Sequence, residues 1–396
     1  MPLIMILRCL LSVASLFVLA ALGYLAWTWY QGDYVRDVHG TLYLVRENWR
    51  LWTVLALAAW SFGGGGILIR PLLAKRDTDP LDPKRGVGQT IPGANGASLY
   101  VEAAGPADAP VIVLTHGWGL DSTIWNYAKR DLSRRFRVIT WDLPGMGLSK
   151  APASAVNLES FAANLKIVIR HTGADRVVLV GHSIGGMATQ TLARDDHAFF
   201  NRHVAGTVLV NTTYRNPLTT MILHKLALLL RFPAIEPMMH LTMWLWPLAW
   251  LGAWKSYLDG TAHIANRLGF GAYVTHSQLA HTTLLTIRNP QRAQAKGNLA
   301  MFGWDATGAM RSVAGPVLLL AGSADIVTKA DASIAIASAA PAATVEIIDK
   351  VNHMGFLERA DVYNPAIAAF ASKAFDTDAF ITAYRPATDA DPRAAS

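Results

Sequence analysis

The chain has 396 residues, of which 52% are hydrophobic and only 16% are charged, and its formal net charge is +7. Soluble proteins average about 25% charged residues, so the composition indicates segments that avoid water. The basic residues are scattered and no aromatic–basic motif of a nucleic-acid module is present, which excludes nucleic acid as a partner and favours an anionic membrane surface. With a single cysteine, Cys9, no intramolecular disulfide or cysteine-based metal site can form.

Two apolar runs occupy the N-terminal region. Residues 9–30 carry no charge, and at about 1.5 Å of rise per residue a helix of this length crosses a hydrocarbon layer of about 30 Å. Residues 51–69 are just long enough to do the same, although four glycines at 63–66 interrupt them. Membrane helices tolerate glycine where a neighbouring helix packs closely. We therefore predict a hairpin of two transmembrane helices over residues 1–76, with the lipid bilayer as a partner.

The alternative for the first run is a cleaved signal peptide. The apolar region of such a peptide usually has only about 7–15 residues, and no A-x-A cleavage site follows this run, so we favour retention in the membrane. Basic residues set the expected orientation, because more of them follow the second run than lie in the connecting loop. The two groups are Arg70, Lys75, Arg76, Lys84 and Arg85 against Arg36, Arg46 and Arg50. This bias predicts a two-span membrane protein with both termini, and the domain after the hairpin, in the cytoplasm.

A different pattern begins after a polar, proline-containing linker at residues 77–90. Short β-branched runs alternate with helix-like stretches, which is typical of parallel strands joined by crossover helices. The runs are residues 111–115, 137–141, 176–180, 204–210, 316–320 and 343–348. We predict a doubly wound, mostly parallel α/β sheet built from residues 91–213 and 301–375. Residues 214–300 have no strand alternation but many Leu, Met and Trp, which predicts a helical cap, and residues 376–396 are expected to be a loosely ordered tail.

A serine between glycines follows the third of these runs. The segment Gly181-His182-Ser183-Ile184-Gly185 fits G-x-S-x-G, in which a strand turns sharply into a helix and lifts the serine clear of the sheet. Glycine and serine are also common in ordinary turns, which is the alternative interpretation. The β-rich run before the motif and the helix-compatible stretch after it favour Ser183 as a nucleophile.

A serine nucleophile needs a base, and the base needs a carboxylate that orients it. Asp325 follows the fifth run and His353 follows the sixth, so the chain order Ser183, Asp325, His353 is the one expected for this arrangement. Asp325 could instead cap the next helix, and Asp331 is near enough in sequence to compete for the acid role. His353 taken singly could be an ordinary surface histidine. Their joint position at successive strand ends favours the catalytic assignment.

Attack on a carbonyl places negative charge on an oxygen, which requires backbone N–H donors. The expected donors are the N–H groups of Ile184 and Trp118, the latter within His116-Gly117-Trp118-Gly119, although this segment could also be a simple tight turn. His116, Gly117 and His182 flank these positions and are candidates for contact with a substrate. Three histidines of the cap lack a convincing ligand spacing, so we expect neither a metal site nor a cofactor. They are His224, His240 and His263.

Five motifs in this order resemble the α/β-hydrolase superfamily over residues 97–370. They are H-G-W-G, D-L-P-G-M-G-L-S at residues 142–149, G-H-S-I-G-G, G-S-A-D and N-H-M-G. The resemblance implies a core sheet that carries Ser183, His353 and Asp325, with an α-helical cap in the insertion. Related epoxide hydrolases and haloalkane dehalogenases have an aspartate where this chain has Ser183, which argues against both activities. The chain also lacks the H-G-G-G run of the hormone-sensitive-lipase-like branch.

The cap contains two dense apolar runs, at residues 221–230 and 238–251. Pliable Met and interfacial Trp suit a greasy binding wall or a lid that touches a membrane, but a cap helix packed on the core would have the same composition. A third membrane span is disfavoured because Pro233, Glu236 and Pro237 interrupt the run. We expect a membrane-anchored serine hydrolase (esterase- or lipase-like) of esters with hydrophobic acyl groups. Amide hydrolysis, acyl transfer, carbon–carbon cleavage and cofactor-free perhydrolysis use the same residues and stay open, as does a non-catalytic membrane scaffold; no oligomeric state is predicted.

Overall fold

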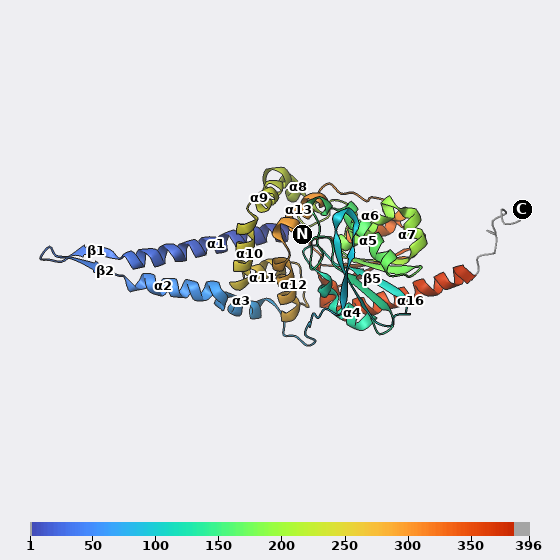
Figure 1. The fold of residues 1–396 in the computed structure, drawn as a ribbon, viewed down its shortest axis with the longest axis horizontal. Coiled ribbons are helices and arrows are strands. Elements are labelled where there is room, and N and C mark those ends of the chain that lie inside the picture. Colours follow the sequence, from blue (N-terminus) through green and yellow to red (C-terminus); the bar gives the residue numbers. More distant parts are fainter. Residues whose placement is uncertain (1, 384–396) are drawn as a thin grey trace, which may run out of the picture.

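The computed structural model describes residues 2–383, and three parts follow one another along its long axis (Figure 1). A narrow hairpin projects from one end, a group of helices lies beside its base, and the sheet with its covering helices forms the other end. The first helix starts next to the helical group and runs outward from there. The hairpin and the sheet are therefore connected through the cap, not only through the linker.

The hairpin consists of α1 (Pro2–Gln31), which leads to the tip, and a returning helix made of α2 (Asn48–Ala59), a π-helical turn (Trp60–Gly64) and α3 (Gly65–Leu73). Two short antiparallel strands, β1 (Asp33–Arg36) and β2 (Leu42–Val45), form the tip. By length and composition, Ile6–Gln31 and Asn48–Leu73 could each cross a membrane. Both predicted helices are present and longer than predicted. The returning helix is interrupted at Gly63, whose φ of 140° is readily adopted by glycine but rarely by other residues.

The glycines after this interruption bring α3 against the cap. A Cβ atom on Gly65 would clash with the carbonyl oxygen of Asp259, and one on Gly66 would lie 2.7 Å from the carbonyl oxygen of Leu258. Both glycines are buried. The returning helix therefore approaches the backbone of the cap more closely than any larger residue would permit.

The sheet has eight strands in the order β10-β9-β8-β7-β5-β6-β4-β3. The six strands from β10 to β6 in this order are parallel, and β4 and β3 pair antiparallel at one edge. Their bounds are β3 Gly88–Pro92, β4 Ser98–Ala104, β5 Val111–Thr115, β6 Arg137–Trp141, β7 Val177–His182, β8 Val204–Val210, β9 Val317–Gly322 and β10 Ala343–Ile348. The predicted doubly wound, mostly parallel sheet is confirmed.

The antiparallel edge was not predicted. β3 and β4 are joined by a short turn around Asn95-Gly96 and not by a crossover helix, so the strand–helix alternation that identified the other strands passes over them. Asn95 and Gly96 both have positive φ, which is the backbone geometry this dipeptide favours in turns. The sheet consequently begins near Gly88, before the predicted start of the core.

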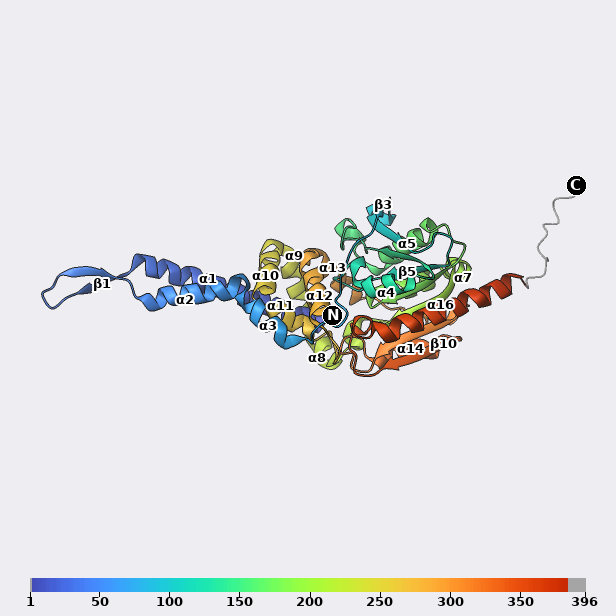
Figure 2. The same cartoon turned by 90° about the horizontal axis from the view of Figure 1, so that it is seen from below.

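Helices cover both faces of the sheet (Figure 2). α5 (Leu158–His171), α6 (Ile184–Asp195) and α14 (Ala330–Ala339) pack into one buried cluster, which includes Phe161, Met187 and Ile336. α4 (Asn126–Leu132) and α16 (Ala360–Ala383) pack into the other, which includes Leu132 and Tyr363. Two short helices, α7 (His197–His203) and α15 (Gly355–Glu358), complete the core. α16 continues beyond residue 376, where the tail was predicted to begin, and residues 384–396 of that tail lie outside the described residues.

The cap is the chain between β8 and β9. It consists of α8 (His224–Leu229), a π-helical turn (Arg231–Ile235), α9 (Glu236–Trp244), α10 (Trp246–Leu258), α11 (Thr261–Arg267), α12 (His276–Arg288) and α13 (Gln291–Met301). The predicted helical character of residues 214–300 agrees with these bounds. Figure 1 shows these helices between the hairpin and the sheet.

Candidate active site

Ser183 lies at a sharp turn between β7 and α6. Its φ of 52° and ψ of −116° are rare for a residue with a side chain, and its neighbours leave no room for a gentler turn. A Cβ on Gly181 would lie 2.6 Å from the backbone of Gly185, so only glycine fits there. The backbone is fixed by hydrogen bonds from Ser183 N to the oxygen of Val210 (3.0 Å) and from the hydroxyl of Thr212 to the oxygen of Ser183 (2.6 Å). The strand and the helix together hold the serine in this conformation.

Two side chains from successive strand ends complete a chain of hydrogen bonds with the serine. Oγ of Ser183 lies 3.0 Å from Nε2 of His353, and Nδ1 of the same imidazole lies 3.0 Å from Oδ2 of Asp325. His353 follows β10 and Asp325 follows β9, so the parallel register brings residues 170 positions apart into contact. His353 is fully buried, and Ser183 is 6% exposed. This geometry allows His353 to accept the serine proton while Asp325 orients the ring.

The carboxylate of Asp325 sits among hydrogen-bond donors. Oδ1 accepts from the backbone N–H groups of Val327 (2.7 Å) and Thr328 (2.9 Å), and Oδ2 accepts from the side chains of Thr328 and Asn211, both at 2.9 Å. Burial alone would raise the pKa of Asp325, but the adjacent His353 and these donors outweigh it and lower the pKa to about 2. The carboxylate therefore stays ionised beside His353 at neutral pH.

Asp331, the alternative acid, lies in the first turn of α14. Its carboxylate pairs with Lys329 at 2.8 Å and its side chain is 76% exposed. The structure brings Asp325, and not Asp331, within hydrogen-bond distance of His353.

Trp118 and Ile184, whose backbone N–H groups are the expected oxyanion donors, are both buried residues. Ile184 is the first residue of α6, where a helix leaves its N–H groups without partners, and Trp118 follows β5. Within residues 2–383, neither N–H donates a hydrogen bond to a protein acceptor. Buried N–H groups without acceptors are uncommon, so this pair fits donors kept free for an oxygen that the protein itself does not supply.

The side chain of Trp118 fixes this loop to the cap. Its indole N–H donates to the carbonyl oxygen of Gln294 on α13 at 3.1 Å, and its ring packs on Phe161 at a centroid distance of 5.7 Å. A Cβ on Gly297 would clash with the indole. A movement of α13 would therefore also move the backbone at Trp118.

His116, Gly117 and His182, the residues expected to touch a substrate, are instead packed against one another and the backbone. His116 accepts from the N–H of Leu143 at 2.9 Å, and its other ring nitrogen lies 2.8 Å from the oxygen of Gly117. Nε2 of His182 lies 3.0 Å from the oxygen of His353, and a Cβ on Gly117 would lie 2.5 Å from the His182 ring. Both imidazoles are fully buried, which lowers the pKa of each, so neither presents a free surface to a ligand.

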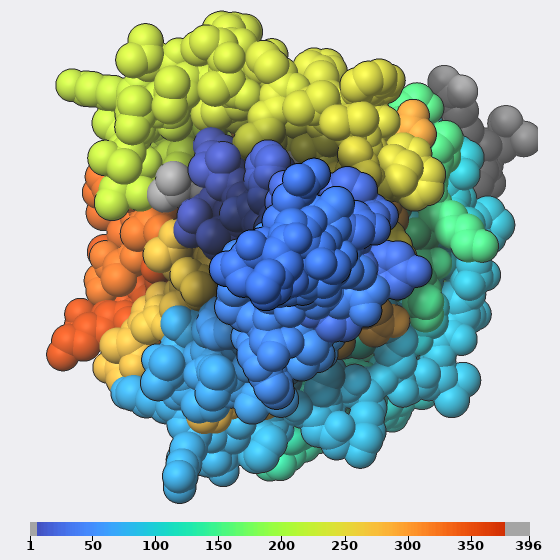
Figure 3. Space-filling view, turned by 90° about the vertical axis from the view of Figure 1, so that its left-hand side faces the viewer, coloured from blue at the N-terminus to red at the C-terminus, as the bar shows by residue number. Residues whose placement is uncertain are grey.

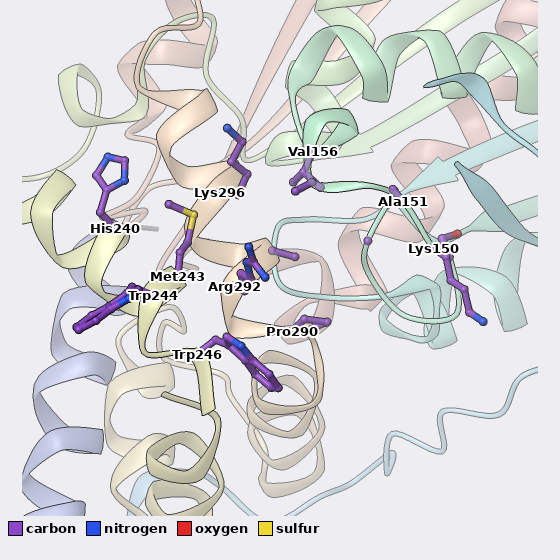
Figure 4. A pocket seen from close by; sticks show the side chains of 14 residues that line it. Lys150, Ala151, Val156, His240, Met243, Trp244, Trp246, Pro290, Arg292 and Lys296 are labelled. Carbon is purple, nitrogen blue, oxygen red and sulfur yellow. The ribbon is translucent and has the colours of Figure 1, made fainter. Parts of the chain in front are cut away.

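A small cavity of about 40 Å³ opens beside the imidazole of His353. Its wall combines the loop after β5 that carries Trp118, the cap and the N-terminal part of α1. The lining residues include Arg8, Trp118, Asn266, Thr286, Asn298 and His353. A much larger cavity, of about 930 Å³, lies on another side of α13. Figure 4 shows it between Trp244 and Trp246 of the cap and Ala151 and Val156 of the core, and neither Ser183 nor His353 lines it. Ser183 lines neither cavity, and the small cavity is linked to it through His353.

Two residues near this cavity were not identified from the sequence. Asn211 follows β8 in the left-handed region (φ 45°) and donates to Asp325 and to the oxygen of Asn352. Its position directly after a predicted strand was the available signal, but a lone asparagine is also common in turns. Arg8 directly precedes the uncharged run at residues 9–30 from which the first helix was predicted, so it lay outside the predicted helix.

Histidines of the cap do not converge on a common site. Among the described residues, no group of three or more His, Cys, Asp or Glu side chains has the arrangement of a metal site. His263 is buried between Tyr257 and its neighbours, with a ring centroid distance of 5.1 Å, and burial lowers its pKa to about 4.

Comparison with known proteins identifies the family. The model of the alpha/beta hydrolase fold matches residues 110–360. The pimeloyl-[acyl-carrier protein] methyl ester esterase of Sodalis glossinidius is 36% identical over 119 residues, which are 30% of this chain and 42% of that protein. The chain spans only about two fifths of the length of the curated relatives it matches, such as 39% of an uncharacterized protein of Mycobacterium tuberculosis.

Similar solved structures extend over more of the chain. An esterase from Thermogutta terrifontis superposes with a TM-score of 0.57 and 21% identity, covering 73% of this chain and 99% of that one. A bacterial membrane phospholipase A superposes with a TM-score of 0.58 and 18% identity, covering 82% of this chain and 97% of that one. At these identities the likeness concerns the fold. Because the family model covers more than half of the sequence and agrees with the strand order, the chain belongs to the α/β-hydrolase fold family.

Proposed function

We propose that this protein is a membrane-anchored serine hydrolase that cleaves carboxylic esters of hydrophobic acyl groups. The observation that carries the proposal is the hydrogen-bonded chain from Ser183 through His353 to Asp325, at 3.0 Å for each step. The strained backbone of Ser183, with its hydroxyl within hydrogen-bond distance of the His353 imidazole, favours a functional role over an ordinary turn. The two buried N–H groups without acceptors add the other element that acyl transfer requires.

The proposed reaction has two halves. Oγ of Ser183 attacks the ester carbonyl while Nε2 of His353 takes the hydroxyl proton, and the oxygen of the tetrahedral intermediate is held by the N–H groups of Trp118 and Ile184. The imidazolium, stabilised by ionised Asp325, then donates its proton to the departing alcohol. Water enters, His353 takes a proton from it, and attack on the acyl-serine releases the acid and restores Ser183.

The buried histidines act as positioning residues in this scheme. His182 contacts the backbone oxygen of His353, and His116 joins the loop that carries Trp118 to the loop at Leu143. Their lowered pKa values keep both rings neutral, so each offers one ring N–H as a donor over the working pH range. Neither touches the reacting atoms.

Anchoring in a membrane is supported by two features of the hairpin and cap. The two hairpin helices are long and apolar enough to span a bilayer, and the side of the cap next to them exposes large apolar side chains. These include Leu241, Trp244, Leu248 and Leu251. A protein with this surface meets substrates that partition into lipid, which favours hydrophobic esters. The basic residues after the second helix favour a cytoplasmic active site, with the β1–β2 tip on the opposite side.

A fluorophosphonate probe and an ester panel test the proposal on the full chain in neutral detergent. The parent is expected to be labelled and to hydrolyse p-nitrophenyl esters, with longer acyl chains preferred over acetate. Ser183→Ala should abolish labelling, and His353→Ala should reduce kcat by about 10⁴-fold or more. The matched control is Ser338→Ala, an exposed serine of α14, which should behave as the parent. Labelling that persists in Ser183→Ala, or no turnover of any ester by the labelled parent, would contradict hydrolysis at this serine.

A further inference from the structure

Arg8 of α1 lies where two cavities meet. It lines the small cavity beside His353, and it also lines an apolar cavity of about 370 Å³ between α1 and the cap helices α9 and α10. Among the residues whose side chains the structure describes, no other is common to the two linings. A side chain from the proposed membrane anchor therefore contributes to the wall of the catalytic cavity.

An arginine at this place needs a reason, because charge in an apolar membrane helix is costly and usually faces a partner or a polar cavity. One guanidinium nitrogen of Arg8 donates to the carbonyl oxygen of Thr286 at 2.9 Å. Among the described side chains, no carboxylate forms an ion pair with it. A guanidinium has five N–H donors, so most of its hydrogen-bonding capacity and all of its charge are available to a ligand.

The larger of the two cavities suits a hydrocarbon chain. Its walls are almost entirely apolar, with Val13 and Leu16 of α1 opposite Leu245 and Ala249 of the cap. Side chains at its rim are open to the surroundings: Leu10 is 60% exposed and Leu248 is 52% exposed. Figure 3 looks at the molecule from the hairpin side and shows α1, in dark blue, lying against the yellow-green atoms of the cap. The opening therefore faces the region in which the hairpin would meet lipid.

The cavity beside His353 is too small to hold such a chain. Its volume is about 40 Å³, and Asn266, Thr282 and Asn298 contribute to its wall. A substrate bound at Ser183 must therefore extend out of it, and its apolar part is best accommodated in the neighbouring cavity beyond Arg8.

Buried polar contacts fix α1 against the cap. Oγ of Ser15 donates to Asp259 at 2.6 Å, and the same carboxylate oxygen pairs with Lys255 at 2.7 Å, with both charged side chains at most 3% exposed. Two turns of helix separate Ser15 from Arg8 on the same side of α1. The position of Arg8 at the junction is therefore set by the fold and not by a free helix end.

We propose that the substrate is an anionic amphiphile whose acyl chain lies in the cavity between α1 and the cap and whose phosphate or carboxylate pairs with Arg8. This inference rests on the proposed function for the reaction itself, but the binding site can be tested without turnover. The shared chemistry is one anionic group attached to one hydrocarbon chain. Arg8 then acts as a specificity-determining residue that the membrane anchor delivers to the active site.

Binding is measured first, on full-length Ser183→Ala in neutral detergent, by the thermal shift caused by dodecyl phosphate, dodecanoate or dodecanol. We expect the anions, and not the alcohol, to stabilise the protein. Arg8→Gln should weaken anion binding about 10- to 100-fold, which is the range of a lost charge-assisted hydrogen bond. Arg8→Lys should retain part of the affinity. Arg36→Gln, which removes the same charge at the hairpin tip, is the matched control and should bind as the parent does.

Kinetics then separate the possible sources of the anion. The pair 1-oleoylglycerol and 1-oleoylglycerol 3-phosphate differs only by a phosphate on the alcohol side, and methyl octanoate and monomethyl suberate differ by a carboxylate on the acyl side. For at least one pair, Arg8→Gln should raise KM for the anionic member about 10-fold or more and leave the neutral member unchanged; the affected pair identifies the source. Labelling of Ser183 by the fluorophosphonate in Arg8→Gln reports that the site is still folded.

Equal effects of Arg8→Gln on charged and neutral members, or equal thermal shifts by dodecanol and the anions, would overturn the proposal and leave hydrolysis at Ser183 intact. Anion binding that depends on Arg8 in a protein that hydrolyses no ester would instead retain the site and overturn the proposed function.

Discussion

Strain at a single residue is central to the site. The φ of 52° at Ser183 costs about 1–3 kcal/mol, and it persists because Val210 and Thr212 hold the backbone on both sides. The strained turn directs the hydroxyl toward His353 instead of into the sheet. The carboxylate of Asp325 is likewise fixed, because it accepts hydrogen bonds from four donors besides the imidazole. The residues around Ser183 therefore stabilise one geometry at the expense of local backbone energy.

Replacement of Asp325 by asparagine should remove most of the esterase activity and leave the fold unchanged. The amide in Asp325→Asn can neither hold the His353 imidazole in the required tautomer nor stabilise the imidazolium, so kcat should fall about 10⁴-fold. Asp331→Asn is the matched control, since Asp331 pairs only with exposed Lys329, and it should retain parental kcat. Hydrolysis of a p-nitrophenyl ester measures both variants. Comparable losses of kcat in the two variants would contradict the assignment of Asp325 as the carboxylate that orients His353.

The same carboxylate should make stability depend on pH in the acid range. Its pKa is about 2 in the folded protein against an ordinary 3.8, so its contribution is fully present above about pH 4 and is lost as the pH falls toward 2. The contribution is roughly 2 kcal/mol. Thermal unfolding of the parent and of Asp325→Asn in detergent measures it, because the gap between them should narrow from pH 6 to pH 2.5. A gap independent of pH over this range would contradict the lowered pKa.

At the scale of elements, the junction between α1 and the cap is polar where the rest of the hairpin is apolar. Ser15, Lys255, Asp259 and Thr261 share hydrogen bonds in a buried cluster. The nearby glycines Gly65 and Gly66 let α3 approach the same segment of the cap. Both hairpin helices therefore pack against the region of α10 and α11, so the hairpin and the cap form one packed unit.

Breaking this cluster should be strongly destabilising. Asp259→Asn leaves Lys255 buried without a counter-ion, which typically costs about 3–5 kcal/mol. Asp361→Asn, which breaks an exposed pair with Arg359, should change stability by less than about 1 kcal/mol. Thermal unfolding of each full-length variant in detergent gives the comparison. Similar melting temperatures for the two would mean that the cluster does not hold α1 to the cap.

Across the whole molecule, the part of the hairpin that extends beyond the cap is somewhat shorter than the hydrocarbon layer of a bilayer. From Ser15, where α1 leaves the cap, to Gln31 the helix rises roughly 25 Å, against about 30 Å of hydrocarbon. Exposed apolar side chains on α9 and α10 lie beside the base of the hairpin and extend its apolar surface. The cap therefore completes the apolar band, which would set the mouth of the cavity at Arg8 within reach of lipid.

Cysteine labelling at two leucines of equal exposure tests whether the cap contacts lipid. Leu248 on α10 and Leu148 in the core are each 52% exposed in the isolated protein. In a Cys9→Ser background, Leu248→Cys should react with a membrane-impermeant maleimide in detergent but about 10-fold more slowly in liposomes, because lipid excludes the charged reagent. Leu148→Cys should react alike in both. Equal reactivity of Leu248→Cys in detergent and liposomes would place the cap outside the bilayer.

The parallel strands, the serine turn, the order of the three candidate site residues and the two apolar helices could be predicted from the amino-acid sequence. These features depend on local periodicity and on short motifs, which need only neighbouring residues. Three further facts depend on the folded chain: Asp325 and not Asp331 contacts His353, His116 and His182 are buried against backbone, and Arg8 borders the cavity beside His353. Each of these is a contact across many residues of chain, and such contacts follow from how the sheet, the cap and the hairpin pack, which no local pattern in the sequence records.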